Sequence, residues 1–143
     1  MLLSDVNVLV YAFREDAADH ERYLAWLDGL VNGPARFAVS DQILSSVVRL
    51  VTHPKVNKTP SKLTDALEFV DVIRNAPGCV LVTPGPEHWR IFEGLCSRLK
   101  LTGNLVSDAW HAALAIEGGH EWITTDRDFA RFPGLRTRHP LDR

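Results

Sequence analysis

The stretch Met1-Leu-Leu-Ser-Asp5-Val-Asn7-Val-Leu-Val10 begins the chain with a short apolar run that reaches a carboxylate. Such a run, bounded by polar residues, is typical of a fully buried strand in a parallel sheet. Asp5 lies where this strand would end, and a carboxylate buried there needs a hydrogen-bond donor, a cation or a metal. Ligands of α/β sheets bind outside the carboxyl ends of the strands. Asp5 is therefore a candidate for chemistry, although taken alone its position before a helix favours a simple capping role.

Segments of strand length alternate with helical patterns along the rest of the chain. Beyond the first strand, strands are predicted at residues 37–39, 79–82 and 122–125, with a weak edge strand at 135–138. The predicted helices cover residues 6–13, 20–31, 41–52, 60–74, 87–100 and 106–117. This alternation predicts a parallel sheet with helices on both faces, and right-handed crossovers favour a doubly wound sheet with the first strand central. The predicted fold class is α/β, with a single domain at residues 1–143 and four to five parallel strands.

The composition is that of an ordinary globular protein. Apolar residues make up 45% and charged residues 24% of the 143 residues, which suits one domain with a sizeable core. Neither a membrane span nor a signal peptide is expected, because no apolar run is long enough and no basic region precedes one at the N-terminus. Cys79 and Cys96 are interpreted as reduced core residues of a cytoplasmic protein. With a net charge of −2, binding of a nucleic acid would need a local basic patch.

Two more aspartates are predicted to lie near Asp5, although they follow it by more than a hundred residues. Asp126 comes at the end of the fourth strand, and Asp108 lies in the first turn of the helix that leads into that strand. A helix that feeds the lower end of a parallel strand begins at the upper end of the sheet, where Asp5 lies. Clustered carboxylates either take up protons or bind a cation, and Mg²⁺ or Mn²⁺ suits an all-oxygen site. For Asp128, two residues further on, a cap and a metal ligand are equally good interpretations.

Three segments carry a resemblance to a known family. They are Leu2-Leu3-Ser4-Asp5-Val6-Asn7-Val8-Leu9, Asn104-Leu105-Val106-Ser107-Asp108-Ala109 and Thr124-Thr125-Asp126-Arg127-Asp128-Phe129, in that order. Each is weak alone, but together at this spacing they are fairly specific, and the chain resembles a PIN domain over essentially its whole length. More narrowly, it resembles the VapC toxins of bacterial type II toxin–antitoxin systems.

The resemblance implies a Mg²⁺-dependent endoribonuclease that is neutralised by a cognate VapB-type antitoxin and forms a homodimer. It implies that Asp5 and Asp108 bind the metal and that Asp126 completes the acidic cluster. An apolar groove formed by the early helices would be the natural place for a helix of the antitoxin. The expected products carry 5′-phosphate and 3′-hydroxyl ends.

One position departs from the family pattern. PIN domains usually carry a Glu-x-x-Arg arrangement on the helix after the second strand, and here Ser46-Val47-Val48-Arg49 stands in its place. A serine hydroxyl can hold a metal-bound water but adds no negative charge, so we expect weaker metal binding. Asp41, more than a turn earlier, could compensate only if the helix were shifted. A subgroup of VapC-like proteins is similar in its Ser-Val-Val-Arg-x-Val-Thr segment, so the serine is not taken as inactivation.

The remaining candidates are basic residues near the predicted site. Arg49 could pair with a carboxylate of the site, contact the RNA backbone or form an ordinary salt bridge, and Arg127 borders the acidic cluster. His111, one turn after Asp108, is interpreted as a packed, hydrogen-bonded residue rather than a ligand. The main alternative function is a catalytically weak PIN domain that binds RNA or a protein partner without cleavage. A receiver-like signalling domain is disfavoured, since the first strand ends in no acidic pair and no lysine follows the last strand.

Overall fold

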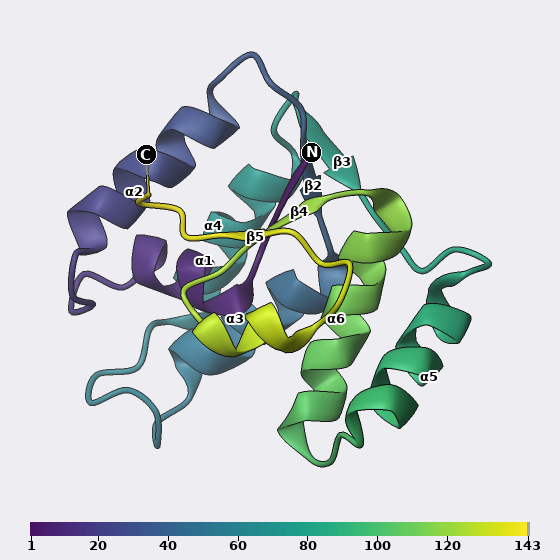
Figure 1. Ribbon diagram of the computed structural model, residues 1–143. Coiled ribbons are helices and arrows are strands. Elements are labelled where there is room, and N and C mark those ends of the chain that lie inside the picture. The colour runs from purple at the N-terminus through teal and green to yellow at the C-terminus, as the bar shows by residue number, and fades with distance from the viewer. Residues whose placement is uncertain (143) are drawn as a thin grey trace.

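The computed structural model describes residues 1–142, which form a five-stranded parallel sheet with helices on both faces (Figure 1). The strands are β1 (Leu2–Ser4), β2 (Phe37–Val39), β3 (Cys79–Leu81), β4 (Glu121–Ile123) and β5 (Thr137–Arg138). The helices are α1 (Val6–Phe13), α2 (His20–Val31), α3 (Asp41–Thr52), α4 (Leu63–Arg74), α5 (His88–Leu99), α6 (Asn104–Gly118) and the short 3₁₀ helix η1 (Arg127–Arg131). The predicted α/β class and the parallel sheet are confirmed.

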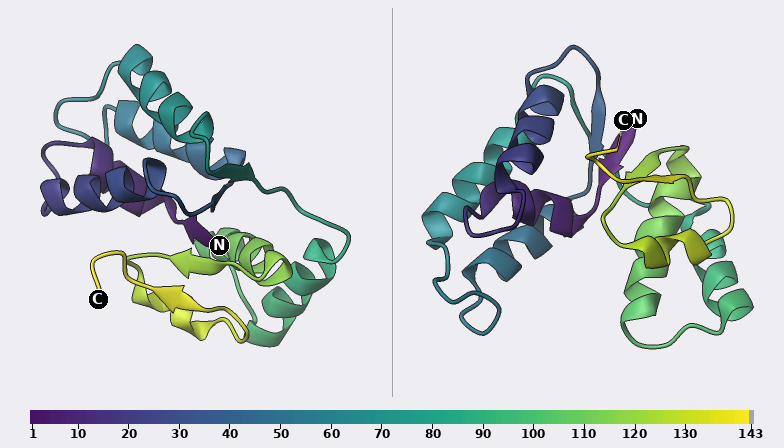
Figure 2. Two further views of the ribbon diagram at one scale, coloured as in Figure 1. Left: turned by 90° about the horizontal axis from the view of Figure 1, so that it is seen from above. Right: turned by 60° about the vertical axis from the view of Figure 1, so that its left-hand side comes forward.

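The strand order is β3-β2-β1-β4-β5, so β1 is central, as predicted. Leu3 is paired with Ala38 of β2 on one side and with Trp122 of β4 on the other. The chain winds outward from β1 through β2 to β3 and then returns to build β4 and β5. Figure 2 accordingly shows α1 to α4 on one face of the sheet and α5, α6 and η1 on the other. The boundary between β1 and β4 is the topological switch point, where ligands of such sheets bind beyond the carboxyl ends of the strands.

The buried side chains of the core explain why helices pack closely on both faces of the sheet around β1. On one face, α3 buries an apolar stripe of Ile43, Leu44, Val47 and Val51 against the sheet. On the other face, α6 presents the fully buried alanines Ala109, Ala112, Ala113 and Ala115. Small side chains allow α6 to approach the sheet closely, and the indole of Trp122 is entirely enclosed there. This close packing brings Asp108 of α6 within electrostatic reach of Asp5 at the carboxyl end of β1.

Several predicted boundaries differ from the structure. β4 ends at Ile123, two residues before the predicted end, so Asp126 lies in the loop beyond the strand and precedes η1. α6 begins at Asn104 rather than residue 106, which places Asp108 in its second turn. Cys79 and Cys96 are half-buried free thiols rather than core residues. Within residues 1–142, no helix has both the length and the apolar character that crossing a bilayer requires.

Candidate functional site

Asp5 is held at the carboxyl end of β1 by hydrogen bonds to the neighbouring strand, to the start of α1 and to Thr124. Its backbone N–H donates to the carbonyl oxygen of Ile123 (2.8 Å), which extends the pairing of β1 with β4 by one residue. Its carboxylate accepts from the N–H of Val6 through Oδ1 (2.7 Å) and from the hydroxyl of Thr124 through Oδ2 (2.7 Å). Only 8% of Asp5 is exposed. Asp5 is therefore the cap of α1, as the simple interpretation held, and also a buried carboxylate at the switch point.

Thr124 is the residue that sequence reasoning missed. It is 5% exposed, directly follows β4, and its hydroxyl both donates to Asp5 and accepts from the N–H of Asp126 (3.0 Å). One side chain thus connects the carboxylate after β1 to the loop after β4. The only signal in the sequence is a hydroxyl residue between a buried strand and an aspartate, and a β-branched threonine fits a strand equally well.

Asp126 and Asp128 lie at the beginning of η1. The Oδ1 of Asp126 accepts from the N–H of Asp128 (2.8 Å), so Asp126 caps this short helix. Asp128 is exposed and lies 3.9 Å from the guanidinium of Arg131. Arg131 also donates from Nε to the carbonyl oxygen of Asp128 (3.0 Å). The loop after β4 therefore carries two carboxylates and a cation beside Asp5.

The charges of these aspartates affect one another. Burial raises the pKa of Asp5, hydrogen bonds from Thr124 and Val6 partly offset this, and the charge of Asp126 raises it further. The pKa of Asp108 is also raised, first by burial and then by the negative charges of Asp126 and Asp5, while Arg131 acts in the opposite sense. The structure thus brings Asp5, Asp108 and Asp126 within electrostatic reach, and a bound cation would relieve their repulsion.

The donor set fits a hard divalent cation in chemistry and charge, since it consists of carboxylate oxygens. The side chains are not gathered into a finished coordination sphere. In the part of the chain that the structure describes, no group of three or more His, Cys, Asp or Glu side chains is arranged to hold one ion. Asp5 and Asp126 direct oxygens to hydrogen-bond donors of the protein instead.

Two of the predicted site residues, Ser46 and Arg49, lie on α3 and not on the acidic loop after β4. Ser46 is half-buried and Arg49 is exposed. Asp41 could compensate for the missing glutamate only if the helix were shifted, and α3 begins at Asp41 as predicted. Asp41 accepts from the guanidinium of Arg74 on α4 (2.8 and 3.2 Å), and this bidentate pair holds its carboxylate between α3 and α4.

His111 is packed, as interpreted from the sequence, but the expected hydrogen bond is wrong for its Nδ1, which has no partner among the described residues. Its ring stacks on that of Trp122, with centroids 5.8 Å apart and planes 13° from parallel. Burial, with a smaller contribution from the charge of His88, lowers its pKa to about 4. A neutral imidazole enclosed by aromatic rings belongs to the core behind Asp108.

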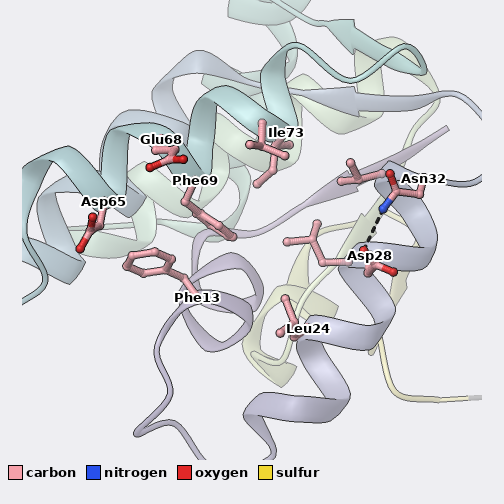
Figure 3. Close-up of a pocket in the computed structure, with 11 residues that line it drawn as sticks. Phe13, Leu24, Asp28, Asn32, Asp65, Glu68, Phe69 and Ile73 are labelled. Atoms are coloured by element: carbon pink, nitrogen blue, oxygen red, sulfur yellow. Dashed lines mark hydrogen bonds between the residues drawn. The ribbon is translucent and has the colours of Figure 1, made fainter.

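An apolar groove runs between α1, α2 and α4, where the sequence led us to expect one (Figure 3). Its volume is about 420 Å³, and Phe13 and Phe69 meet in its floor with ring centroids 4.7 Å apart. Leu24 of α2 is 44% exposed and Val72 of α4 is 59% exposed, so the groove presents apolar surface to the outside. The charged side chains that line it are all acidic: Asp28, Asp65 and Glu68.

Comparison with known proteins gives a consistent result. The family model described as the PIN domain matches residues 2–135. The chain is 42% identical to VapC ribonuclease Mb2897 of Mycobacterium bovis, over 99% of this chain and 97% of that protein. It is 35% identical to ribonuclease VapC25 of Mycobacterium tuberculosis, over 98% of this chain and 99% of that protein.

Solved structures share the fold at low sequence identity. VapBC2 from Rickettsia felis, in a crystal structure bound to a DNA fragment from its promoter, matches with a TM-score of 0.72 at 19% identity. That match covers 96% of this chain and 97% of the other. FitAcB from Neisseria gonorrhoeae matches with a TM-score of 0.65 at 19% identity, over 98% of each chain. The chain belongs to the PIN domain family and, within it, to the VapC ribonucleases, the toxins of type II toxin–antitoxin systems.

Proposed function

We propose that this VapC ribonuclease cuts RNA internally by Mg²⁺-dependent hydrolysis at the edge formed by Asp5, Asp108 and Asp126. The observation that carries the proposal is the buried Asp5 carboxylate at the switch point, whose pKa is raised by burial and by a second carboxylate. A protein has little reason to concentrate such charge at a sheet edge unless a cation compensates for it. A divalent ion held there would activate a water molecule and stabilise negative charge on the phosphate.

Each residue of the edge has a distinct role in this proposal. Asp5, Asp108 and Asp126 supply the carboxylate ligands, with Asp128 and Ser46 as outer members that can hold water. Thr124 fixes the orientation of Asp5 through its 2.7 Å hydrogen bond. Arg127 and Arg49, both exposed, would steady the RNA phosphates. Since Asp5 and Asp126 now accept hydrogen bonds from the protein, ligand binding would turn at least one carboxylate toward the ion.

Cleavage of total RNA by purified, antitoxin-free protein tests the proposal. We expect specific fragments with Mg²⁺ or Mn²⁺, none with EDTA, and none from Asp108→Asn. Asp19→Asn is the matched control, because it removes one exposed carboxylate at the start of α2 that is not among the charges acting on Asp5 or Asp108. The fragments should carry 5′-phosphate and 3′-hydroxyl ends. A 2′,3′-cyclic phosphate would mean that the ribose hydroxyl attacked, and this would overturn the hydrolytic mechanism.

The second candidate function is RNA or partner binding with little cleavage. Ser46 favours it, because α3 supplies no carboxylate at the position where the family usually has one, and Asp41 is engaged by Arg74. The variant Ser46→Glu distinguishes the ribonuclease function from the binding function. If the serine has reduced activity, the variant should cut RNA faster than the wild type at limiting Mg²⁺. If wild type and variant bind RNA equally and neither cuts it, the binding function is favoured.

We further propose that a VapB-type antitoxin neutralises the protein by placing an apolar segment in the groove between α1, α2 and α4. Two of the structural relatives are described as a toxin–antitoxin complex and as VapBC2. The groove offers exposed Leu24 and Val72, and its lining carries carboxylates but no cation. The segment that fits it is therefore apolar with flanking lysine or arginine residues. Formation of a homodimer stays a prediction.

A further inference from the structure

A polar cavity of about 280 Å³ lies beside the acidic edge and is separate from the apolar groove. One side is formed by residues 124–127, which follow β4, and the other by residues 137–139 and Asp142, in and after β5. Because β4 and β5 are neighbouring parallel strands, the cavity continues the edge of the sheet on which Asp5 lies. It shares Thr124 and Asp126 with the candidate metal site. We call it the β5 cavity.

His139 has a defined tautomer in the wall of the β5 cavity. The backbone N–H of Leu141 donates to its Nδ1 (3.1 Å). A backbone amide can only donate, so Nδ1 accepts, and the hydrogen of the neutral ring is on Nε2. The N–H of Asp142 closes the same turn on the carbonyl oxygen of His139 (3.1 Å), and the ring of Tyr23 lies 6.2 Å away, centroid to centroid. His139 is thus a positioned N–H donor whose Nε2 has no hydrogen-bond partner among residues 1–142.

A guanidinium group is available on the opposite wall. Arg127 is exposed, and its side chain makes no hydrogen bond or ion pair with the rest of the described chain. Arg138 also lines the cavity, but it is engaged by Glu121 at 3.0 Å. The lining carries two carboxylates, Asp126 and Asp142, beside three threonine hydroxyls. Arg127 and His139 Nε2–H are therefore the side-chain nitrogen donors of the β5 cavity that are not already engaged within the described chain. This lining suits a ligand rich in acceptor oxygens and does not suit an apolar one.

We propose that the β5 cavity binds one nucleotide of the RNA, next to the scissile phosphodiester, through donation from His139 Nε2–H and Arg127 to its oxygens. The inference rests on the proposed ribonuclease function. Because it shares Thr124 and Asp126 with the metal site, the cavity adjoins the place of the reacting phosphate. Its volume is slightly below the range of about 300–1,000 Å³ that holds drug-sized ligands, so it suits a single nucleotide rather than a longer segment.

Two substitutions of His139 separate binding from local folding. In His139→Asn, the side-chain carbonyl oxygen reaches the place of Nδ1 and can still accept from Leu141, but nothing replaces the Nε2–H donor. In His139→Gln, the amide reaches the place of Nε2 and can restore the donor. The matched control is His53→Asn, because Nδ1 of His53 accepts from the N–H of Lys55 (3.0 Å) in the same local arrangement on the loop after α3.

The measurement is fluorescence anisotropy of a short, labelled, mixed-sequence single-stranded RNA in EDTA, followed by steady-state cleavage of the same RNA with Mn²⁺. We expect His139→Asn and Arg127→Gln each to weaken binding about three- to tenfold, which is the effect of one lost hydrogen bond. His139→Gln should recover most of the affinity, and His53→Asn should bind as the wild type does. In cleavage, His139→Asn should raise KM with little change in kcat.

Two results would overturn the proposal. If wild type cuts RNA and His139→Asn matches it in both affinity and KM, the ribonuclease stands and the β5 cavity is not a nucleotide site. If His139→Asn and His139→Gln lose stability and affinity together, the histidine acts only by holding the turn after β5. Wild-type protein that neither binds nor cuts RNA would remove the proposed function and this inference with it.

Discussion

The hydroxyl of Thr124 is the smallest group on which the acidic edge depends. It donates to Asp5 and accepts from the backbone of Asp126, so it joins the ends of β1 and β4. The sequence allowed us to predict that three aspartates would meet, because the ends of β1 and β4 and the start of α6 come to the same edge of a parallel sheet. It did not allow us to predict Thr124, because the geometry of one hydroxyl depends on the pairing of two strands more than a hundred residues apart.

Thr124→Val tests this connection. The substitution conserves shape but leaves a buried oxygen of Asp5 without a donor, which should cost about 1–3 kcal/mol of stability. Because the hydrogen bond from Thr124 lowers the pKa of Asp5, its loss should raise that pKa, and cleavage should begin at higher pH than in the wild type. Activity should fall about 10–100-fold. Chemical denaturation and a pH–rate profile check this, and Thr124→Ser is the control that keeps the hydroxyl. A normal pH profile in Thr124→Val would show that the hydroxyl does not position Asp5.

His111 makes a separate prediction about acid stability. Its pKa falls from an ordinary 6.5 to about 4 in the folded protein, so the unfolded chain takes up the proton first as the pH falls. The free energy of unfolding is therefore unaffected by the titration of His111 above pH 6.5 and falls progressively down to about pH 4. The total loss is about 3 kcal/mol. His111→Phe keeps a ring against Trp122 and cannot take up a proton. Urea midpoints from pH 7 to pH 4 should therefore fall less steeply in the variant. Parallel pH dependence in the two proteins would show that His111 does not cause the loss.

At the scale of elements, the sequence predicted where helices and strands lie better than it predicted where they end. The helix at residues 20–31 and the central place of β1 are confirmed, since apolar periodicity and crossover handedness determine both. The end of β4 was predicted two residues late, because pairing with β1 and β5 ends the strand and η1 then begins. The role of Asp41 was also out of reach, since its partner Arg74 lies on another helix, 33 residues further along the chain.

The groove between α1, α2 and α4 gives a prediction at this scale. Leu24→Glu places a charge on an exposed apolar position of α2, in a groove that already carries three carboxylates. We expect binding of the cognate antitoxin to weaken at least thirtyfold, about 2 kcal/mol, with RNA cleavage unchanged. Titration calorimetry measures the affinity of the wild type and of the variant for the antitoxin. Val56→Glu, at an apolar position that is 60% exposed on the loop after α3, is the control. Equal affinity in wild type and Leu24→Glu would mean that the antitoxin binds elsewhere.

At the scale of the whole molecule, the fold brings carboxylates from both ends of the chain to one edge. Asp5 follows the first strand, while Asp108 and Asp126 come from the last third of the sequence, and packing of α6 and β4 around β1 joins them. In the apo protein this arrangement opposes stability, since burial and mutual repulsion raise the pKa values of Asp5 and Asp108. Above the normal aspartate pKa, the raised pKa values mean that ionising both groups costs more in the folded chain than in the unfolded chain. A bound divalent ion should therefore stabilise the folded chain and raise its Tm.

Calorimetric titration of the metal-free protein with Mn²⁺ shows whether the acidic edge binds a metal ion. We expect one ion per chain, with affinity lowered at least about tenfold in each of Asp5→Asn, Asp108→Asn and Asp126→Asn. Asp19→Asn should match the wild type, and Ser46→Glu should bind more tightly. If the three Asn variants bind Mn²⁺ as the wild type does, or if the wild type binds none, the acidic edge is not a metal site and the hydrolytic mechanism built on it is contradicted.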